Sequence, residues 1–192
     1  FPIWAERVND VPDTRDAETV RVIAQQYAWN VHYPGPDGRF GATRIDLVDE
    51  QDNPIGLDRS SDFAGDDFTT INQLHIPVNR KIRVDLSSKD VIHNFKLPEL
   101  RVSQDAIPGM VIPVHFTATS TSEEFLKTTV GTKREGKGLE IACAQLCGLG
   151  HYRMKGYVTI HEEDDYQAWL DEQASYLEEE DGDDWGDDGD DW

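Results

Sequence analysis

The chain of 192 residues is long enough for one good-sized domain with extensions, and its formal net charge is −20. Sixteen of its 38 acidic residues lie between Glu162 and Trp192, where there is no Lys or Arg, so residues 1–161 hold 22 acids against 18 bases. This body has no basic patch, which disfavours nucleic acid as a partner. No run of the sequence approaches the ~18 consecutive apolar residues of a membrane-spanning helix.

Residues 1–18 are expected to be a lead-in to the folded domain. The chain begins at Phe1 and not at a methionine, and no secretory signal is visible. We therefore expect the natural N-terminus to lie further upstream.

The next part of the chain reads as a series of short strands. Residues 19–33 alternate apolar and polar side chains, which predicts one long strand, and the sequence PGPDG at 34–38 predicts a turn after it. A polar loop rich in Gly and Asp is expected from about 50 to 68. Many short strands separated by Pro and Gly predict an all-β Greek-key sandwich or barrel over residues 19–161. The further strand-like segments are 44–49, 72–78, 81–88, 90–100, 111–120, 138–143 and 154–161.

The C-terminal part changes character. Apolar residues near helical spacing, Tyr166, Trp169, Leu170 and Ala174, predict a helix over 162–175. Residues 176–192 are mostly acidic with Gly and Trp spacers, which predicts a disordered tail. Two interpretations of this tail stay open: a solubilising terminus, or an electrostatic attraction for a basic partner protein that weakens at high salt.

Four soft metal ligands gather in the sequence CAQLCGLGHYRM at 143–154. Cys143, Cys147, His151 and Met154 follow one another at spacings of four, four and three. A Cys143–Cys147 disulfide would close a very short loop and leave the other two unexplained. A zinc site of two Cys and two His would leave the methionine unused. Copper uses thiolate, imidazole and thioether together, so the pattern favours copper, with zinc and disulfide as alternatives.

The presence of two cysteines suggests two copper ions bridged by two thiolates, with one terminal histidine on each copper. That arrangement needs a second histidine from elsewhere in the chain. His93, at the start of a strand-like segment that ends in Pro98, is the best candidate. Spacing alone does not select it over the other histidines, which are His32, His75, His115 and His161.

These segments resemble the copper-A domain of subunit II of the haem–copper cytochrome c oxidases over most of residues 19–170. CAQLCGLGHYRM matches the family pattern Cys-x₃-Cys-x₃-His-x₂-Met, which is highly specific. DVIHNFKLPEL at 90–100 resembles the segment with the first histidine, and QDAIPGM at 104–110 resembles the turn that follows it.

The resemblance implies a cupredoxin-like Greek-key β-barrel with a dinuclear mixed-valence copper-A centre. Cys143 and Cys147 would then bridge two copper ions. His93 and Met154 would complete one copper, and His151 with the backbone carbonyl of Gln145 would complete the other. The domain would be an electron-transfer part of an oxidoreductase, with no active site of its own.

The resemblance also implies partners and a location. One electron at a time would come from cytochrome c or another small redox protein and pass to haem in oxidase subunit I. Two N-terminal transmembrane helices would precede the sequence and hold the domain at the periplasmic face of the membrane. A nitrous oxide reductase contains the same copper loop, but the matches outside the loop favour the oxidase.

The sequence departs from the family pattern at two places. Gln145 stands where the family usually has a Glu that helps to bind magnesium, so a magnesium role is doubtful. The family's aromatic stretch usually reads Gln-Trp-Tyr-Trp, whereas this chain has Gln26-Tyr27-Ala28-Trp29. The first Trp of that stretch is the family's usual residue for electron entry, and Tyr27 stands in its place. The resemblance therefore makes Tyr27 and Trp29 the candidates for electron input, with a packed strand aromatic as the alternative for Tyr27. No Cys-x-x-Cys-His motif is present, so no covalent haem c is expected.

Overall fold

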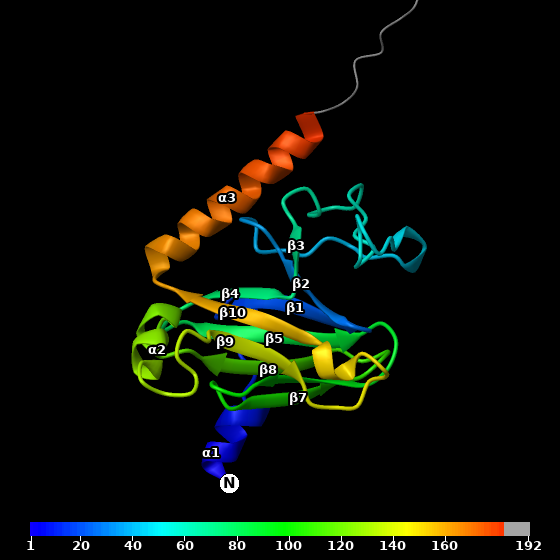
Figure 1. Cartoon of the computed structure of the whole chain (residues 1–192). Helices are drawn as coiled ribbons and strands as arrows, with labels where there is room; N and C mark the ends of the chain where they lie inside the picture. The colour runs from blue at the N-terminus through cyan, green and yellow to red at the C-terminus, as the bar shows by residue number, and fades with distance from the viewer. Residues whose placement is uncertain (183–192) are drawn as a thin grey trace, which may run out of the picture.

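A computed structural model describes residues 1–182 and consists of two five-stranded sheets that pack face to face (Figure 1). The order in the first sheet is β3 (Phe68–Ile71), β2 (Ala28–Tyr33), β1 (Glu18–Gln25), β5 (Lys81–Ser88) and β8 (Ile112–Thr117). The order in the second sheet is β4 (Gln73–Pro77), β10 (Lys155–His161), β9 (Leu139–Cys143), β6 (His93–Leu97) and β7 (Val102–Ala106). The predicted all-β, cupredoxin-like sandwich is confirmed.

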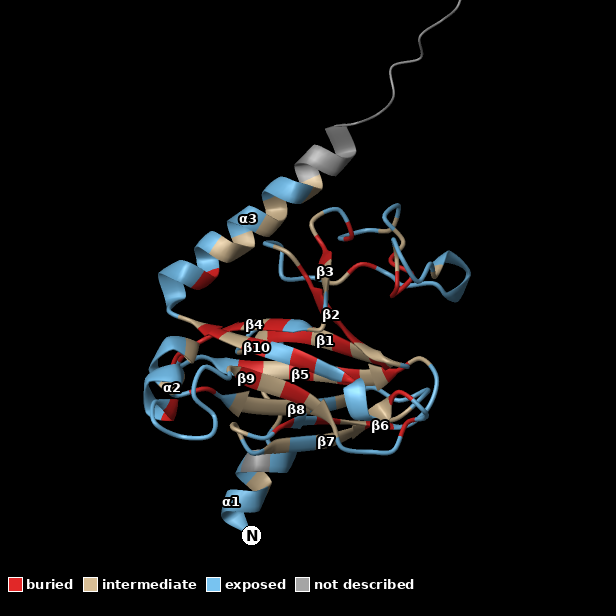
Figure 2. Cartoon of the chain, viewed as in Figure 1, coloured by how far each residue is buried: buried red, intermediate tan, exposed pale blue. Residues whose placement is uncertain are grey.

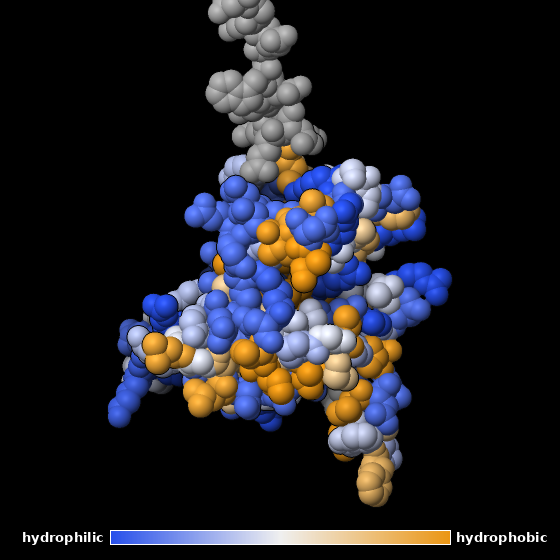
Figure 3. All heavy atoms as spheres, turned by 90° about the vertical axis from the view of Figure 1, so that its right-hand side faces the viewer, coloured by the Kyte–Doolittle hydropathy of each residue, from blue (hydrophilic) through white to orange (hydrophobic). Residues whose placement is uncertain are grey.

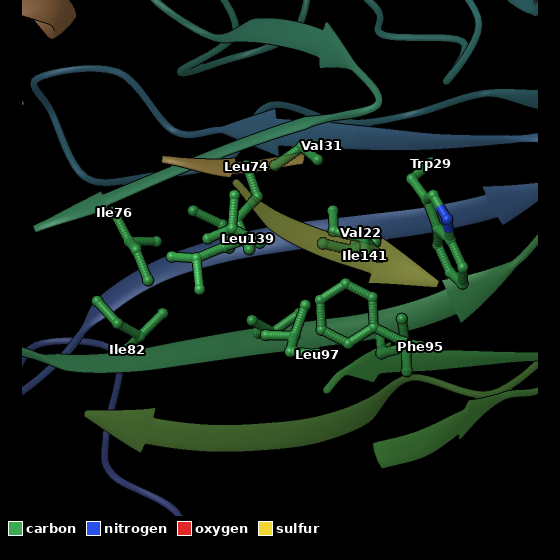
Figure 4. Packing of buried hydrophobic residues seen from close by; sticks show 14 of the residues in the cluster. Val22, Trp29, Val31, Leu74, Ile76, Ile82, Phe95, Leu97, Leu139 and Ile141 are labelled. Carbon is green, nitrogen blue, oxygen red and sulfur yellow. The ribbon is translucent and has the colours of Figure 1, made fainter. Parts of the chain in front are cut away.

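The core lies between the two sheets because apolar residues alternate along the strands. In β5, every second residue is buried, and β10 follows the same period of two. Val22, Leu86 and Ile141 are each fully buried, and Figure 4 shows side chains of both sheets meeting in this layer. Complete burial of such a side chain stabilises the fold by about 1.5–3 kcal/mol. Figure 2 shows that most buried residues lie on the strands of the two sheets.

Several elements differ from the sequence predictions, and the strands β3 and β7 were not predicted. Residues 19–33 are two antiparallel strands, because a tight turn at Gln26 and Tyr27 pairs Gln25 with Ala28. The segment 44–49 contains a short 3-10 helix, Ile45–Leu47, in place of a strand. The helix α2 (Ser122–Thr129) was not predicted, although the Thr121 hydroxyl and the Glu124 carboxylate form a reciprocal capping box that marks its start.

The chain ends of the described part are helical. The lead-in contains α1 (Pro2–Trp4) and η1 (Ala5–Asn9), and the Glu6 carbonyl lies 3.0 Å from His115 Nε2 of β8. The helix α3 (Glu163–Gly182) continues beyond the expected end at residue 175, while the last ten residues of the expected disordered tail lie outside the described residues. Among residues 1–182, none of the helices combines the length and hydropathy that a bilayer crossing requires.

Candidate metal centre

The ligand loop, residues 143–154, connects β9 to β10 at one end of the sandwich and is the yellow segment at the right of Figure 1. Antiparallel pairing of β9 with β10 places Ala142 opposite Lys155, so both ends of the loop are fixed by the sheet. The β6 strand lies on the other side of β9, with Phe95 opposite Cys143. Since His93 begins β6, this register brings its side chain to the same end of the sandwich as the loop.

The six residues predicted as ligands lie together: the sulfur atoms of Cys143 and Cys147 are neighbours, and each of the other four has a ligand atom beside one of them. Cys143 Sγ lies 3.8 Å from Cys147 Sγ and 3.8 Å from His93 Nδ1. Cys147 Sγ lies 3.5 Å from His151 Nδ1 and 3.7 Å from Met154 Sδ, and the Gln145 carbonyl oxygen is 3.1 Å from Cys143 Sγ. Both cysteines are free, and their sulfur separation is far above the ~2.05 Å of a disulfide bond.

Exposure differs between the two sides of the cluster. His93, Met154 and Cys147 are buried, whereas Gln145 is exposed and His151 is partly exposed. Figure 3 looks onto this end of the molecule, where apolar side chains gather on the surface. The exposed apolar residues of the ligand loop are Leu146, Leu149 and Tyr152. Buried residues therefore cover the cluster on its interior side, and its other side opens toward an apolar surface.

The two thiols are not equivalent in the metal-free protein. Burial disfavours the Cys143 thiolate, but contacts with His93, the backbone and His151 outweigh that penalty and lower the pKa of Cys143. Burial and the neighbouring Cys143 raise the pKa of Cys147. Since the metal ligand is the thiolate, binding of a metal would release protons from this site.

The chemistry of the donor set fits copper. His93, Cys143 and Cys147 present ligand atoms that all lie within 4.8 Å of one another. A structural zinc site needs four ligands around one ion and has no use for a thioether. Here a thioether and a second imidazole lie beside Cys147 in addition to that group, and thiolate with thioether is the soft set that copper prefers.

The two aromatic residues considered for electron input occupy different environments. Tyr27 is half-buried and packs against the ligand loop: a Cβ at Gly150 would come within 2.6 Å of its ring, and a Cβ at Gly148 within 2.7 Å of its hydroxyl. Trp29 is fully buried, with its ring edge-on to His93 at 6.1 Å and to Phe95 at 5.5 Å. Figure 4 shows the Trp29 and Phe95 side chains in the core. Tyr27 thus lies at the loop surface and Trp29 lies inside, next to a candidate ligand.

Two residues that contact this cluster were not predicted from the sequence. Asp90 Oδ1 accepts a hydrogen bond from His93 Nε2 at 2.8 Å, and Gln26 Nε2 donates to the Cys147 carbonyl at 2.5 Å. A carboxylate three residues before a candidate histidine ligand was the available signal for Asp90. Gln26 had no signal of its own, since its contact depends on a turn that was predicted as continuous strand.

Comparisons with known proteins identify the same family over most of the chain. The family model of the cytochrome c oxidase subunit II periplasmic domain matches residues 18–160. Alternative cytochrome c oxidase subunit 2 of Bradyrhizobium diazoefficiens is 35% identical over 175 residues, which cover 91% of this chain and 56% of that protein. Cytochrome c oxidase subunit 2 of Cereibacter sphaeroides is 28% identical over 166 residues, with 80% and 48% covered. The chain spans about half the length of these curated relatives.

Solved structures agree with this assignment. The periplasmic domain of subunit II of cytochrome oxidase (CoxB) of Bradyrhizobium japonicum superposes with a TM-score of 0.56 at 26% identity, covering 87% of this chain and 99% of that one. A subunit II domain solved as a mixed disulfide intermediate with the thioredoxin-like protein TlpAs gives a TM-score of 0.54 at 26% identity, with 88% and 96% covered. The sequence match, the fold and the position of the cysteine loop lead to one conclusion: the chain belongs to the cytochrome c oxidase subunit II family and contains its periplasmic domain.

Proposed function

We propose that the domain is a one-electron relay built around a dinuclear copper-A centre. The observation that carries the proposal is a pair of free thiols whose sulfur atoms are 3.8 Å apart, each with an imidazole Nδ1 within contact distance. Membership of the subunit II family supports copper as the metal. Two copper ions bridged by two thiolates share one electron, so that charge can pass with little change in ligand geometry.

We assign Cys143 and Cys147 as the bridging ligands. His93 and Met154 would complete one copper, while His151 and the Gln145 carbonyl would complete the other. The protein's own contribution is rigidity and exclusion of water: His93 and Met154 are buried at 0% and 1% exposure, respectively. Gln145 carries no charge, which argues against magnesium at this position.

The surface beside the centre suits a transient partner. Leu146, Leu149 and Tyr152 expose 78%, 95% and 81% of their area around the partly exposed His151. Apolar side chains next to a redox centre favour brief docking of another protein. The proposed donor is cytochrome c or another small redox protein, with input at Tyr27 or His151, and the proposed acceptor is haem in oxidase subunit I. Trp29 would act from inside, beside His93, and not as a docking residue.

The location follows from the same family. We propose that the whole protein is anchored by N-terminal transmembrane helices and holds this domain at the periplasmic face of the membrane.

A thioredoxin-like protein is a further proposed partner. The solved relative was captured in a mixed disulfide with such a protein. Cys143 is partly exposed and its pKa is lowered, which are the properties of a thiol that takes part in disulfide exchange. The partner would keep Cys143 and Cys147 reduced before copper binds.

Metal analysis tests the function directly. The metal-free protein is loaded with copper or zinc under reducing conditions and desalted, the copper sample is partly oxidised with ferricyanide, and both are assayed for bound metal and for visible absorption. We expect two copper ions per chain and a thiolate-to-copper absorption band. One zinc per chain with no retained copper would support the alternative, a zinc-stabilised binding module, and would sink the proposal.

A further inference from the structure

One carboxylate contacts both a proposed copper ligand and the turn that supports the ligand loop. Asp90 lies between β5 and β6, and its Oδ1 accepts hydrogen bonds from His93 Nε2 at 2.8 Å and from its neighbour's backbone, Val91 N–H, at 2.6 Å. Its Oδ2 accepts a hydrogen bond from the Gln26 backbone N–H at 2.7 Å. Both oxygens of the carboxylate are therefore engaged by hydrogen bonds.

The contact with His93 determines which ring nitrogen faces the thiols. A carboxylate that accepts from Nε2 keeps a proton on that nitrogen and turns Nδ1 toward the thiols. Nδ1 is the atom that lies 3.8 Å from Cys143 Sγ. The ring has no exposed area, and Trp29 packs edge-on against it. His93 is thus oriented for metal binding by protein contacts alone.

The contact with Gln26 reaches the other cysteine. By holding the Gln26 backbone, Asp90 fixes the turn between β1 and β2, from which the Gln26 side chain donates to the Cys147 carbonyl. The adjacent Tyr27 fills the space beside Gly148 and Gly150, where a Cβ would overlap it. The turn therefore supports the half of the ligand loop that contains Cys147.

We propose that Asp90 is the positioning residue of the copper centre, orienting His93 toward Cys143 on one side and, through the β1–β2 turn, supporting Cys147 on the other. The inference rests on the proposed copper function. It adds that the ligands are set before metal arrives, since one carboxylate joins the start of β6 to the β1–β2 turn, and that turn contacts the ligand loop. A site organised in advance changes little between oxidised and reduced forms, which is what rapid electron transfer requires.

The variant Asp90→Asn tests this inference, because the amide has the shape of the carboxylate but accepts through one oxygen and is neutral. The matched control is Asp67→Asn, which removes the partner of another buried histidine: Asp67 Oδ2 lies 2.6 Å from His32 Nε2 and 2.8 Å from the Gly41 backbone nitrogen. We expect Asp90→Asn to weaken copper binding by roughly 10–100-fold in chelator competition. We also expect a changed reduction potential and a changed copper spectrum. Asp67→Asn should lower the unfolding midpoint but leave all three copper readouts unchanged.

Nitrogen NMR of the metal-free protein separates positioning from the copper function. We expect a protected, hydrogen-bonded Nε2–H signal from His93 in the wild type and loss of that protection in Asp90→Asn. A folded Asp90→Asn protein with the wild-type Nε2–H signal, copper affinity and potential would overturn the inference. If wild-type protein binds no copper but shows the Nε2–H signal, the proposed function fails while the positioning of His93 stands. Gln26→Leu covers the case in which Asp90→Asn does not fold: unchanged copper affinity and spectrum in this variant would contradict the link to Cys147.

Discussion

Two pairs of histidines in this domain show how surroundings decide what a histidine does. His93 and His151 each place Nδ1 within 3.8 Å of a thiol sulfur at the end of the sandwich. His75 and His161 lie under α3, where His75 Nδ1 is 2.8 Å from His161 Nε2 and the His75 ring stacks on Trp169 at 4.2 Å. The first pair is surrounded by soft donors and the second by aromatic rings. The first can bind metal, and the second attaches a helix to the sheet.

The largest expected effect is on the metal. His93→Gln removes an imidazole from the sulfur cluster, so we expect loss of the shared-electron copper spectrum and of part of the bound copper. His75→Gln serves as the control, since that ring lies against His161 and Trp169. Copper content and spectra of both variants check this prediction. Equal loss of copper in His93→Gln and His75→Gln would mean that His93 is not a copper ligand.

Changes beside the second pair, His75 and His161, should instead lower the stability of the fold. Trp169 stacks on His75 and packs edge-on to Tyr33 and Phe68 at 5.1 and 5.5 Å. Trp169→Ala should lower the free energy of unfolding by about 2–4 kcal/mol, because the cavity removes contacts from both helix and sheet. Denaturant unfolding measures the change. The copper spectrum of the variant should stay as in the wild type, and a lost spectrum would contradict the separation of the two regions.

His75, beside His161, should make the free energy of unfolding depend on pH. Burial, with a smaller contribution from His161, lowers the pKa of His75 from 6.5 to about 4. Between these values the unfolded chain binds more protons than the folded one, so the free energy of unfolding decreases as pH falls from 6.5 toward 4. After allowance for partial exposure, we expect a change on the order of 1–2 kcal/mol. Unfolding of the wild type and His75→Phe at several pH values tests this, since the variant should lack that part of the slope.

The smallest expected effect is at Met154. Met154→Leu keeps the volume of a side chain that is 1% exposed and removes a weak thioether ligand. We expect retained copper, a shifted reduction potential and a stability change below about 1.5 kcal/mol. Voltammetry and metal analysis measure both outcomes. Complete loss of copper would show that the thioether is essential for binding.

The sequence predicted the parts of the site that are local in the chain. Four ligand side chains lie within twelve residues, so their spacing alone favoured copper. His93 could not be chosen by spacing, because its position depends on the pairing of β6 with β9. The structure accounts for the other histidines: His32 lies against Asp67, His115 against the Glu6 carbonyl, and His75 and His161 against each other. Family resemblance selected His93 before this geometry was known.

The contacts that organise the site were harder to predict. The β1–β2 turn reads as continuous strand, since residues 19–33 keep their alternation through Gln26 and Tyr27. Without that turn, neither the contact of Gln26 with Cys147 nor the packing of Tyr27 on the loop glycines can be inferred. Strand periodicity indicates which residues face the core, but a reversal of direction depends on long-range pairing.

The most direct test of the central claim is electron paramagnetic resonance of the copper-loaded, partly oxidised protein. A thiolate-bridged dinuclear centre predicts the hyperfine pattern of one unpaired electron shared equally by two copper nuclei, and Cys147→Ser should abolish that pattern. A pattern from one copper nucleus in the wild type, or a shared-electron pattern that survives in Cys147→Ser, would contradict the assignment of Cys143 and Cys147 as bridging ligands.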